Sequence, residues 1–151
     1  MIVPAGLQWR PPPFTVGRKV SVQEHAGRAA LMLKRTLADC REFVAGDHTV
    51  LRELLHPAKQ AVRLGYSLAH GKLAPGRRSK WHVLTSSEVY YFIAGQGRFT
   101  IDAETCRVEA GSTIYVPPGG KQSLENTGTT DVEFLCLVDP PWRVDDEAVL
   151  E

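Results

Sequence analysis

Residues 76–126 hold the side chains whose types and spacing best suit a chemical site. His82 and Glu88 lie six positions apart there, and imidazole and carboxylate groups bind metals and move protons in proteins. Residues two apart on a strand face the same side, so a strand through His82 would place Leu84 beside it. We therefore expect His82 and Glu88 to reach one interior space, with Tyr90 in register behind Glu88.

The spacing of this stretch resembles the two sequence motifs of the cupin superfamily, G-x5-H-x-H-x3-E-x6-G and G-x5-P-x-G-x2-H-x3-N. Eight of the ten defined positions match, namely Gly76, His82, Glu88, Gly95, Gly111, Pro117, Gly119 and Asn126. Leu84 stands where the family has its second histidine, and Gln122 stands where it has its last one. The resemblance implies a cupin. The sequence departs from the family pattern at two positions, both of which matter for metal binding.

In the family, the histidines and the glutamate of these motifs bind one divalent metal ion inside the barrel. The resemblance therefore implies His82, Glu88 and Gln122 as ligands of an ion such as Mn, Fe, Ni or Zn. An amide oxygen is a poorer ligand than imidazole for zinc or iron but is acceptable to manganese. No histidine follows His82, so we consider His70 as the fourth ligand. If its face of the strand points inward, His70 and His82 would approach each other on neighbouring strands.

Each candidate also has a purely structural interpretation. Glu88 can be a buried carboxylate that accepts a hydrogen bond from a tyrosine or an arginine. Gln122 can satisfy backbone groups of a loop, and His70 can be a strand-end histidine near solvent.

Two functional hypotheses follow for a cupin that binds a small molecule. The first is a metal-dependent enzyme that acts on a small organic acid or a sugar-derived substrate, with Tyr90 as proton donor. The alternative is a metal-free binding module or isomerase in which Leu84 marks a site that has lost its ion.

Short apolar and β-branched runs separated by Gly and Pro predict an all-β fold from about Thr49 onward. These runs are 49–56, 63–70, 88–94, 97–101, 105–109, 113–116 and 132–138. With the cupin resemblance they predict a single jelly-roll barrel, a double-stranded β-helix, over residues 32–151. We expect ten apolar and aromatic side chains to be mostly buried: Tyr66, Leu68, Leu84, Tyr90, Phe92, Phe99, Ile114, Val116, Phe134 and Leu137. The resemblance also implies a homodimer.

Composition bounds the class of protein. The chain has 151 residues, enough for one domain, and no apolar stretch approaches the roughly 20 residues of a membrane helix. Residues 1–31 contain three consecutive prolines and are basic, so we expect an N-terminal arm there. The absence of a secretory signal pattern and of paired cysteines predicts a cytoplasmic protein. Residues 1–80 carry 14 Lys and Arg against 5 Asp and Glu, but no signature of nucleic-acid binding accompanies that charge.

Overall fold

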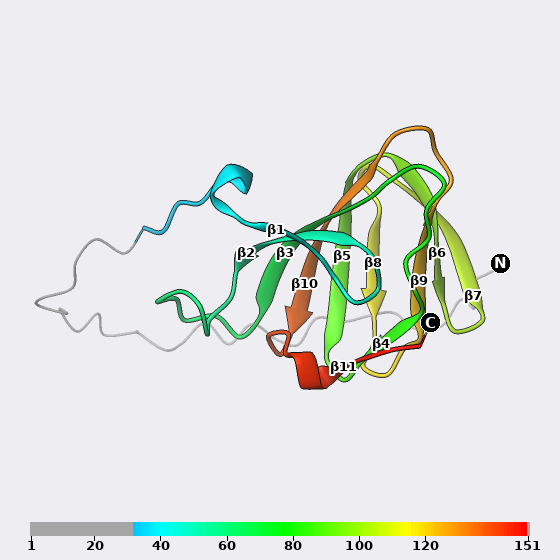
Figure 1. The fold of residues 1–151 in the computed structure, drawn as a ribbon. Helices are drawn as coiled ribbons and strands as arrows, with labels where there is room; N and C mark the ends of the chain where they lie inside the picture. The colour runs from blue at the N-terminus through cyan, green and yellow to red at the C-terminus, as the bar shows by residue number, and fades with distance from the viewer. Residues whose placement is uncertain (1–31, 151) are drawn as a thin grey trace, which may run out of the picture. The chain divides into compact units, whose positions relative to one another are not determined.

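Two antiparallel β-sheets form a barrel in the computed structural model, which describes residues 32–150 (Figure 1). The predicted basic arm over residues 1–31 lies outside the described residues. The elements are η1 (Leu37–Asp39), β1 (Glu42–Val44), β2 (Val50–Leu55), β3 (Ser67–Leu73), β4 (His82–Leu84), β5 (Ser87–Ala94), β6 (Gln96–Ile101), β7 (Glu104–Glu109), β8 (Thr113–Val116), β9 (Gln122–Asn126), β10 (Val132–Asp139), η2 (Val144–Asp146) and β11 (Glu147–Val149).

The strand order confirms the predicted all-β jelly-roll architecture. One sheet runs β1-β2-β3-β10-β5-β8 and the other runs β11-β4-β9-β6-β7, so neighbours in space are often distant in sequence. Apolar alternation identified seven strands, β2, β3, β5, β6, β7, β8 and β10. It missed β1, β4 and β11, which are only three residues long, and β9, whose sequence QSLEN is largely polar. The strand through His82 was expected from the motif spacing instead. Among the described residues no helix has the length and hydropathy of a membrane span.

One half of the barrel interior is packed with aromatic rings, and we call it the aromatic half. It contains Tyr90 and Phe92 from β5, Phe99 from β6 and Phe134 from β10. The Tyr90 ring lies 5.0 Å from Phe99 and 5.4 Å from Phe134, centroid to centroid, and both pairs are tilted. Tilted rings at these separations stabilise a core beyond the area they bury.

Six of the ten side chains predicted for the core are buried, namely Leu84, Tyr90, Phe92, Phe99, Val116 and Phe134. The other four, Tyr66, Leu68, Ile114 and Leu137, are only partly buried. In β10 the buried residues alternate as Phe134, Cys136 and Val138, which places Leu137 on the outer face.

The side chain of Asn126, at the end of β9, links two other segments. Its amide nitrogen donates to the carbonyl oxygens of Leu73 (2.7 Å) and Thr130 (2.8 Å), and its oxygen accepts the Gly128 amide (2.9 Å). Asn126 is fully enclosed, and these bonds satisfy both its donor hydrogens and its acceptor. The motif asparagine therefore has a structural role here.

Candidate functional site

Beside the aromatic half lies a mostly apolar cavity of about 560 Å³, and we call this region the cavity half. Two segments outside the central strands, residues 43–53 and 142–149, contribute to its wall together with β3, β4, β5 and β10. Its acidic and basic lining residues are four carboxylates and two nitrogen bases: Asp47, Glu53, Glu88, Glu147, Lys59 and His82. An apolar cavity with a few converging polar groups is the usual form of a small-molecule site.

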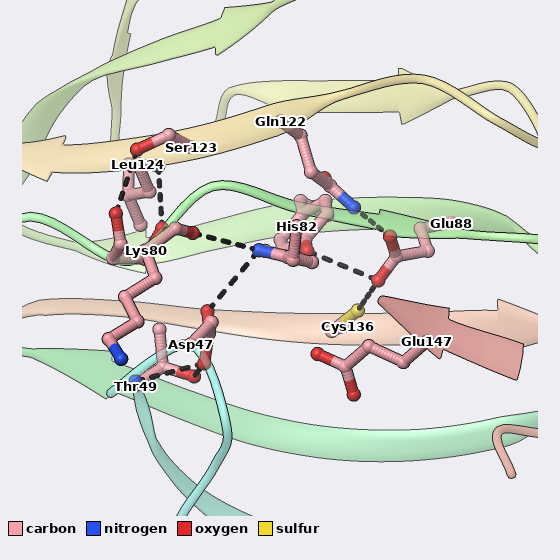
Figure 2. Close-up of polar contacts among 12 residues, drawn as sticks. Asp47, Thr49, Lys80, His82, Glu88, Gln122, Ser123, Leu124, Cys136 and Glu147 are labelled. Carbon is pink, nitrogen blue, oxygen red and sulfur yellow. Dashed lines mark hydrogen bonds and ion pairs between the residues drawn. The ribbon is translucent and has the colours of Figure 1, made fainter. Parts of the chain in front are cut away.

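His82 begins β4 and lies buried in the cavity wall. Its Nδ1 is 3.1 Å from the Lys80 carbonyl oxygen and 3.7 Å from Oδ2 of Asp47 (Figure 2). Asp47 is itself held in place because its Oδ1 accepts bonds from the backbone amide and the hydroxyl of Thr49. A carbonyl acceptor fixes the proton on Nδ1, so the lone pair of the neutral ring is on Nε2.

Glu88, on β5, is buried and accepts hydrogen bonds from three side chains. The Tyr90 hydroxyl lies 3.1 Å and the Cys136 thiol 3.4 Å from Oε1, while the Gln122 amide nitrogen donates to Oε2 (Figure 2). Burial raises the pKa of the Glu88 carboxyl above its usual value, with His82 and the three donors acting in the opposite direction. The predicted proximity of His82, Glu88 and Tyr90 is found in the structure.

Tyr90 and Cys136 both keep their protons in this environment. Burial raises the pKa of the Tyr90 phenol well above its usual value, and the nearby Glu88 adds to the effect. Burial and Glu88 likewise raise the pKa of the Cys136 thiol. Both groups are therefore hydrogen-bond donors that orient the Glu88 carboxylate.

Gln122 is fully enclosed on β9, directly opposite His82 on β4. It lies behind Glu88, outside the set of residues that line the cavity. Its Oε1 is the single buried side-chain N or O atom without a hydrogen-bond partner among residues 32–150. An unpaired buried acceptor costs about 1–3 kcal/mol, so this oxygen is a position where a further donor or a cation would be stabilising.

Leu84 occupies the position of the second family histidine, is buried and lines the cavity. In the part of the chain that the structure describes, no three His, Cys, Asp or Glu side chains gather as a metal-ligand set. A third protein ligand beside His82 and Glu88 would therefore be a side chain of another type, such as the amide of Gln122.

The structure does not bring His70 to His82. His70 pairs with Leu135 of β10, whose neighbours Phe134 and Cys136 line the cavity, so Leu135 and His70 face away from it. The His70 Nε2 instead lies 3.0 Å from Oε2 of Glu133. Alternation in the sequence predicts which residues of β3 share a face, but it does not tell which of the two faces points inward. His70 was proposed as a ligand on the condition that its face points inward, and in the structure that face points away from the cavity.

Sequence reasoning missed three residues of the cavity half. Asp47 lies in the turn between β1 and β2, and Trp142 and Glu147 lie in the C-terminal segment. None belongs to a motif, and only the pairing of β11 with β4 brings Glu147 beside Leu84.

Comparison with known proteins agrees with this architecture. Residues 69–138 match the cupin domain family. The uncharacterised protein MJ1618 of Methanocaldococcus jannaschii is 34% identical over 122 residues, which cover 80% of this chain and 96% of that protein. The chain belongs to the cupin family. The family match ends before Trp142 and Glu147, so the cavity of this cupin is completed by residues outside the shared domain.

Two relatives carry functional names. The oxalate-binding protein of Thermotoga maritima is 33% identical over 92 residues, which cover 60% of this cupin and 71% of that protein. A crystal structure of a predicted oxalate decarboxylase, also from Thermotoga maritima, superposes with a TM-score of 0.61 at 25% identity, covering 72% of this chain and 99% of that one. These similarities support a small-molecule-binding role for this cupin in the general sense of the family.

Proposed function

We propose that this cupin binds a small carboxylic acid through a divalent metal ion held by His82, Glu88 and Gln122. The observation that carries the proposal is the convergence of an imidazole, a carboxylate and an amide at one buried point. In the amide orientation of the structure Oε1 of Gln122 has no hydrogen-bond donor, and a turned amide would direct this oxygen toward Glu88. The names of the two Thermotoga maritima relatives support a carboxylic acid as the ligand class.

The residues present fit an oxygen-preferring ion. One nitrogen and two oxygen ligands suit manganese better than a tetrahedral zinc site. Because the amide nitrogen of Gln122 faces Glu88, the amide would have to turn over to offer its oxygen to an ion. Leu84 supplies no ligand, which leaves coordination positions for the two oxygens of a bound carboxylate.

The charge of the cavity wall favours binding of a cation before an acid. Lys59 pairs with Glu53 at 2.8 Å, so these two charges offset each other. Asp47, Glu88 and Glu147 remain, and they would repel an anion that entered alone. The bound ion would supply positive charge that orients and polarises the carboxylate of the ligand.

The neighbouring side chains would then position the ligands of the ion. The Lys80 carbonyl keeps the His82 lone pair on Nε2, and Tyr90 and Cys136 hold the Glu88 carboxylate by hydrogen bonds. We propose Tyr90 as an orienting donor and not as the source of a transferred proton, because its raised pKa makes it a weak acid.

The metal-free alternative is supported by a different observation. Glu88 already accepts three hydrogen bonds, and Leu84 offers no ligand. In that case His82 and Glu88 would act as a metal-independent acid–base pair on a bound molecule.

Metal analysis of the full chain separates the two functions. After purification without chelators and incubation with manganese, iron, nickel or zinc, we expect close to one ion per chain. His82→Ala should abolish binding, whereas the matched control His70→Ala should retain it because His70 faces away from the cavity. Glycolate, which carries a single carboxylate, should bind, by calorimetry, only to the loaded protein. Fewer than about 0.1 ion per chain in every case would reject the proposal in favour of the metal-free alternative.

The homodimer implied by the family resemblance remains a proposal. Tyr91, Ile93 and Tyr115 expose 44–60% of their surface on the outer face of the six-stranded sheet, which supports association through that face. Sedimentation equilibrium of the wild type and of Tyr115→Asp would test it, since a monomeric wild type contradicts the proposal.

A further inference from the structure

Glu147 is a cavity residue that is not a ligand of the proposed metal site. It begins β11 and pairs directly with Leu84 of β4. Directly paired residues point to the same side of a sheet, and both of these line the cavity. Glu147 therefore stands beside the position that the family gives to a histidine.

Its carboxylate is held in a defined orientation. The indole nitrogen of Trp142, another cavity residue, donates to Oε2 of Glu147 at 3.0 Å. Glu147, Asp47 and Cys136, all labelled in Figure 2, line the same cavity. Within residues 32–150 no lysine or arginine forms an ion pair with Glu147 or Asp47, in contrast to Glu53, which Lys59 neutralises. Glu147 is therefore a negative charge of the cavity wall that no lysine or arginine among these residues offsets, whereas Asp47 has His82 at 3.7 Å.

We infer that Glu147 determines ligand specificity by rejecting a second carboxylate and accepting a hydrogen-bond donor. The ligand is then a carboxylic acid whose other end carries an ammonium or hydroxyl group, and dicarboxylic acids are disfavoured. This inference rests on the proposed function, because the metal ion is what binds the first carboxylate.

The physical reason lies in the charges that a bound ligand would meet. A divalent ion together with Glu88 leaves one positive charge, which one carboxylate of the ligand offsets. A second carboxylate that met Glu147 in this mostly apolar cavity would be repelled strongly by its like charge. An ammonium or hydroxyl group in the same place would donate to Oε1 of Glu147, the oxygen that Trp142 leaves free.

The experiment compares three small acids that share the carboxylate and differ at the other end: oxalate, glycolate and glycine. Their affinities for the manganese-loaded full chain are measured by calorimetry for the wild type, for Glu147→Gln and for the double variant Glu53→Gln with Lys59→Met. The glutamine variant keeps the shape and the bond from Trp142 but removes the charge. We expect Glu147→Gln to bind oxalate about tenfold more tightly and glycine about tenfold more weakly, each corresponding to about 1.4 kcal/mol.

The double variant is the matched control, since it removes a cavity carboxylate together with its cationic partner and leaves the net charge of the cavity wall unchanged. Its ratio of glycine to oxalate affinity should stay within about twofold of the wild type. A general effect on folding would move all three affinities together and would not reverse the preference. If the wild type binds none of the three acids, the proposed function fails. If it binds them but Glu147→Gln leaves their ratio unchanged, the role of Glu147 is rejected while the metal site stands.

Discussion

The aromatic half and the cavity half belong to one barrel but take their residues from different parts of the chain. The aromatic half comes from β5, β6 and β10, all within the shared cupin domain. The cavity half draws Asp47 and Glu147 from segments that flank that domain. Strands β5, β6 and β10 contribute to both, because Tyr90, Phe99 and Phe134 also line the cavity. Phe92 is not among the lining residues, so stability and ligand binding should be separable by substitution at Phe92 on one side and at the cavity residues on the other.

Among the substitutions that test the difference between the two halves, Phe92→Ala should have the largest effect, a loss of unfolding free energy. Phe92 is 1% exposed in the aromatic half and would leave a large void. Such truncations cost about 3–5 kcal/mol of unfolding free energy. Urea denaturation would measure the loss, and the protein that remains folded should bind metal as the wild type does. A loss below about 1 kcal/mol would show that the aromatic half is not the main stabilising core.

Leu84→His changes the cavity half and should raise its affinity for a metal ion without disturbing the aromatic half. It restores an imidazole at the family position, beside His82 on β4, and so adds a ligand to the proposed site. We expect manganese or zinc to bind about tenfold more tightly, measured by calorimetry. If the variant binds no better than the wild type, the interior is not arranged as a ligand cage.

Glu88→Gln should reveal how pH acts on the metal-free cavity half. Because the pKa of Glu88 is raised by burial, the folded protein holds this proton more tightly than the unfolded chain does. The resulting stability is fully present below the usual pKa of 4.5 and is lost as the pH rises through the raised value. Chelator-treated wild type should therefore lose stability relative to Glu88→Gln between pH 4.5 and neutral pH. Denaturant titrations that show a constant difference over this range would contradict it.

The smallest effect is expected from removing residues 1–31. A chain that starts at Met32 keeps all of the buried apolar residues of the described barrel. Its thermal midpoint should lie within a few degrees of the full chain, the shift that about 1 kcal/mol produces. Calorimetry would check this, and loss of folding on truncation would make the arm an integral element.

Much of the barrel could be predicted from the sequence because local chemistry determines it. Gly76, Gly95, Gly111 and Gly119, predicted as turn residues, all have positive φ. Glycine is required at position 95 for two reasons: φ is +77°, and a side chain there would collide with the backbone of Asp131. The motif spacing also placed His82 and Glu88 correctly, because it encodes the strands that carry them.

What the sequence left open depends on pairing over long distances. The face of β3 that carries His70 is decided by its register with β10, more than 60 residues later. Glu147 enters the cavity only through the pairing of β11 with β4. Neither strand pairing produces a periodic pattern in the sequence. Prediction from residue type therefore included His70 as a candidate ligand and did not include Glu147.

The hydrogen bonds of Asn126 have a consequence for motion. One side chain joins the end of β3, at Leu73, to the loop before β10, through Gly128 and Thr130. Neither segment can open to solvent without breaking the same amide contacts, so the two should fluctuate as one unit. The Gly128 amide hydrogen should therefore exchange with deuterium only when the end of β3 opens as well. Its exchange should be far slower than is usual for a residue in a short surface loop.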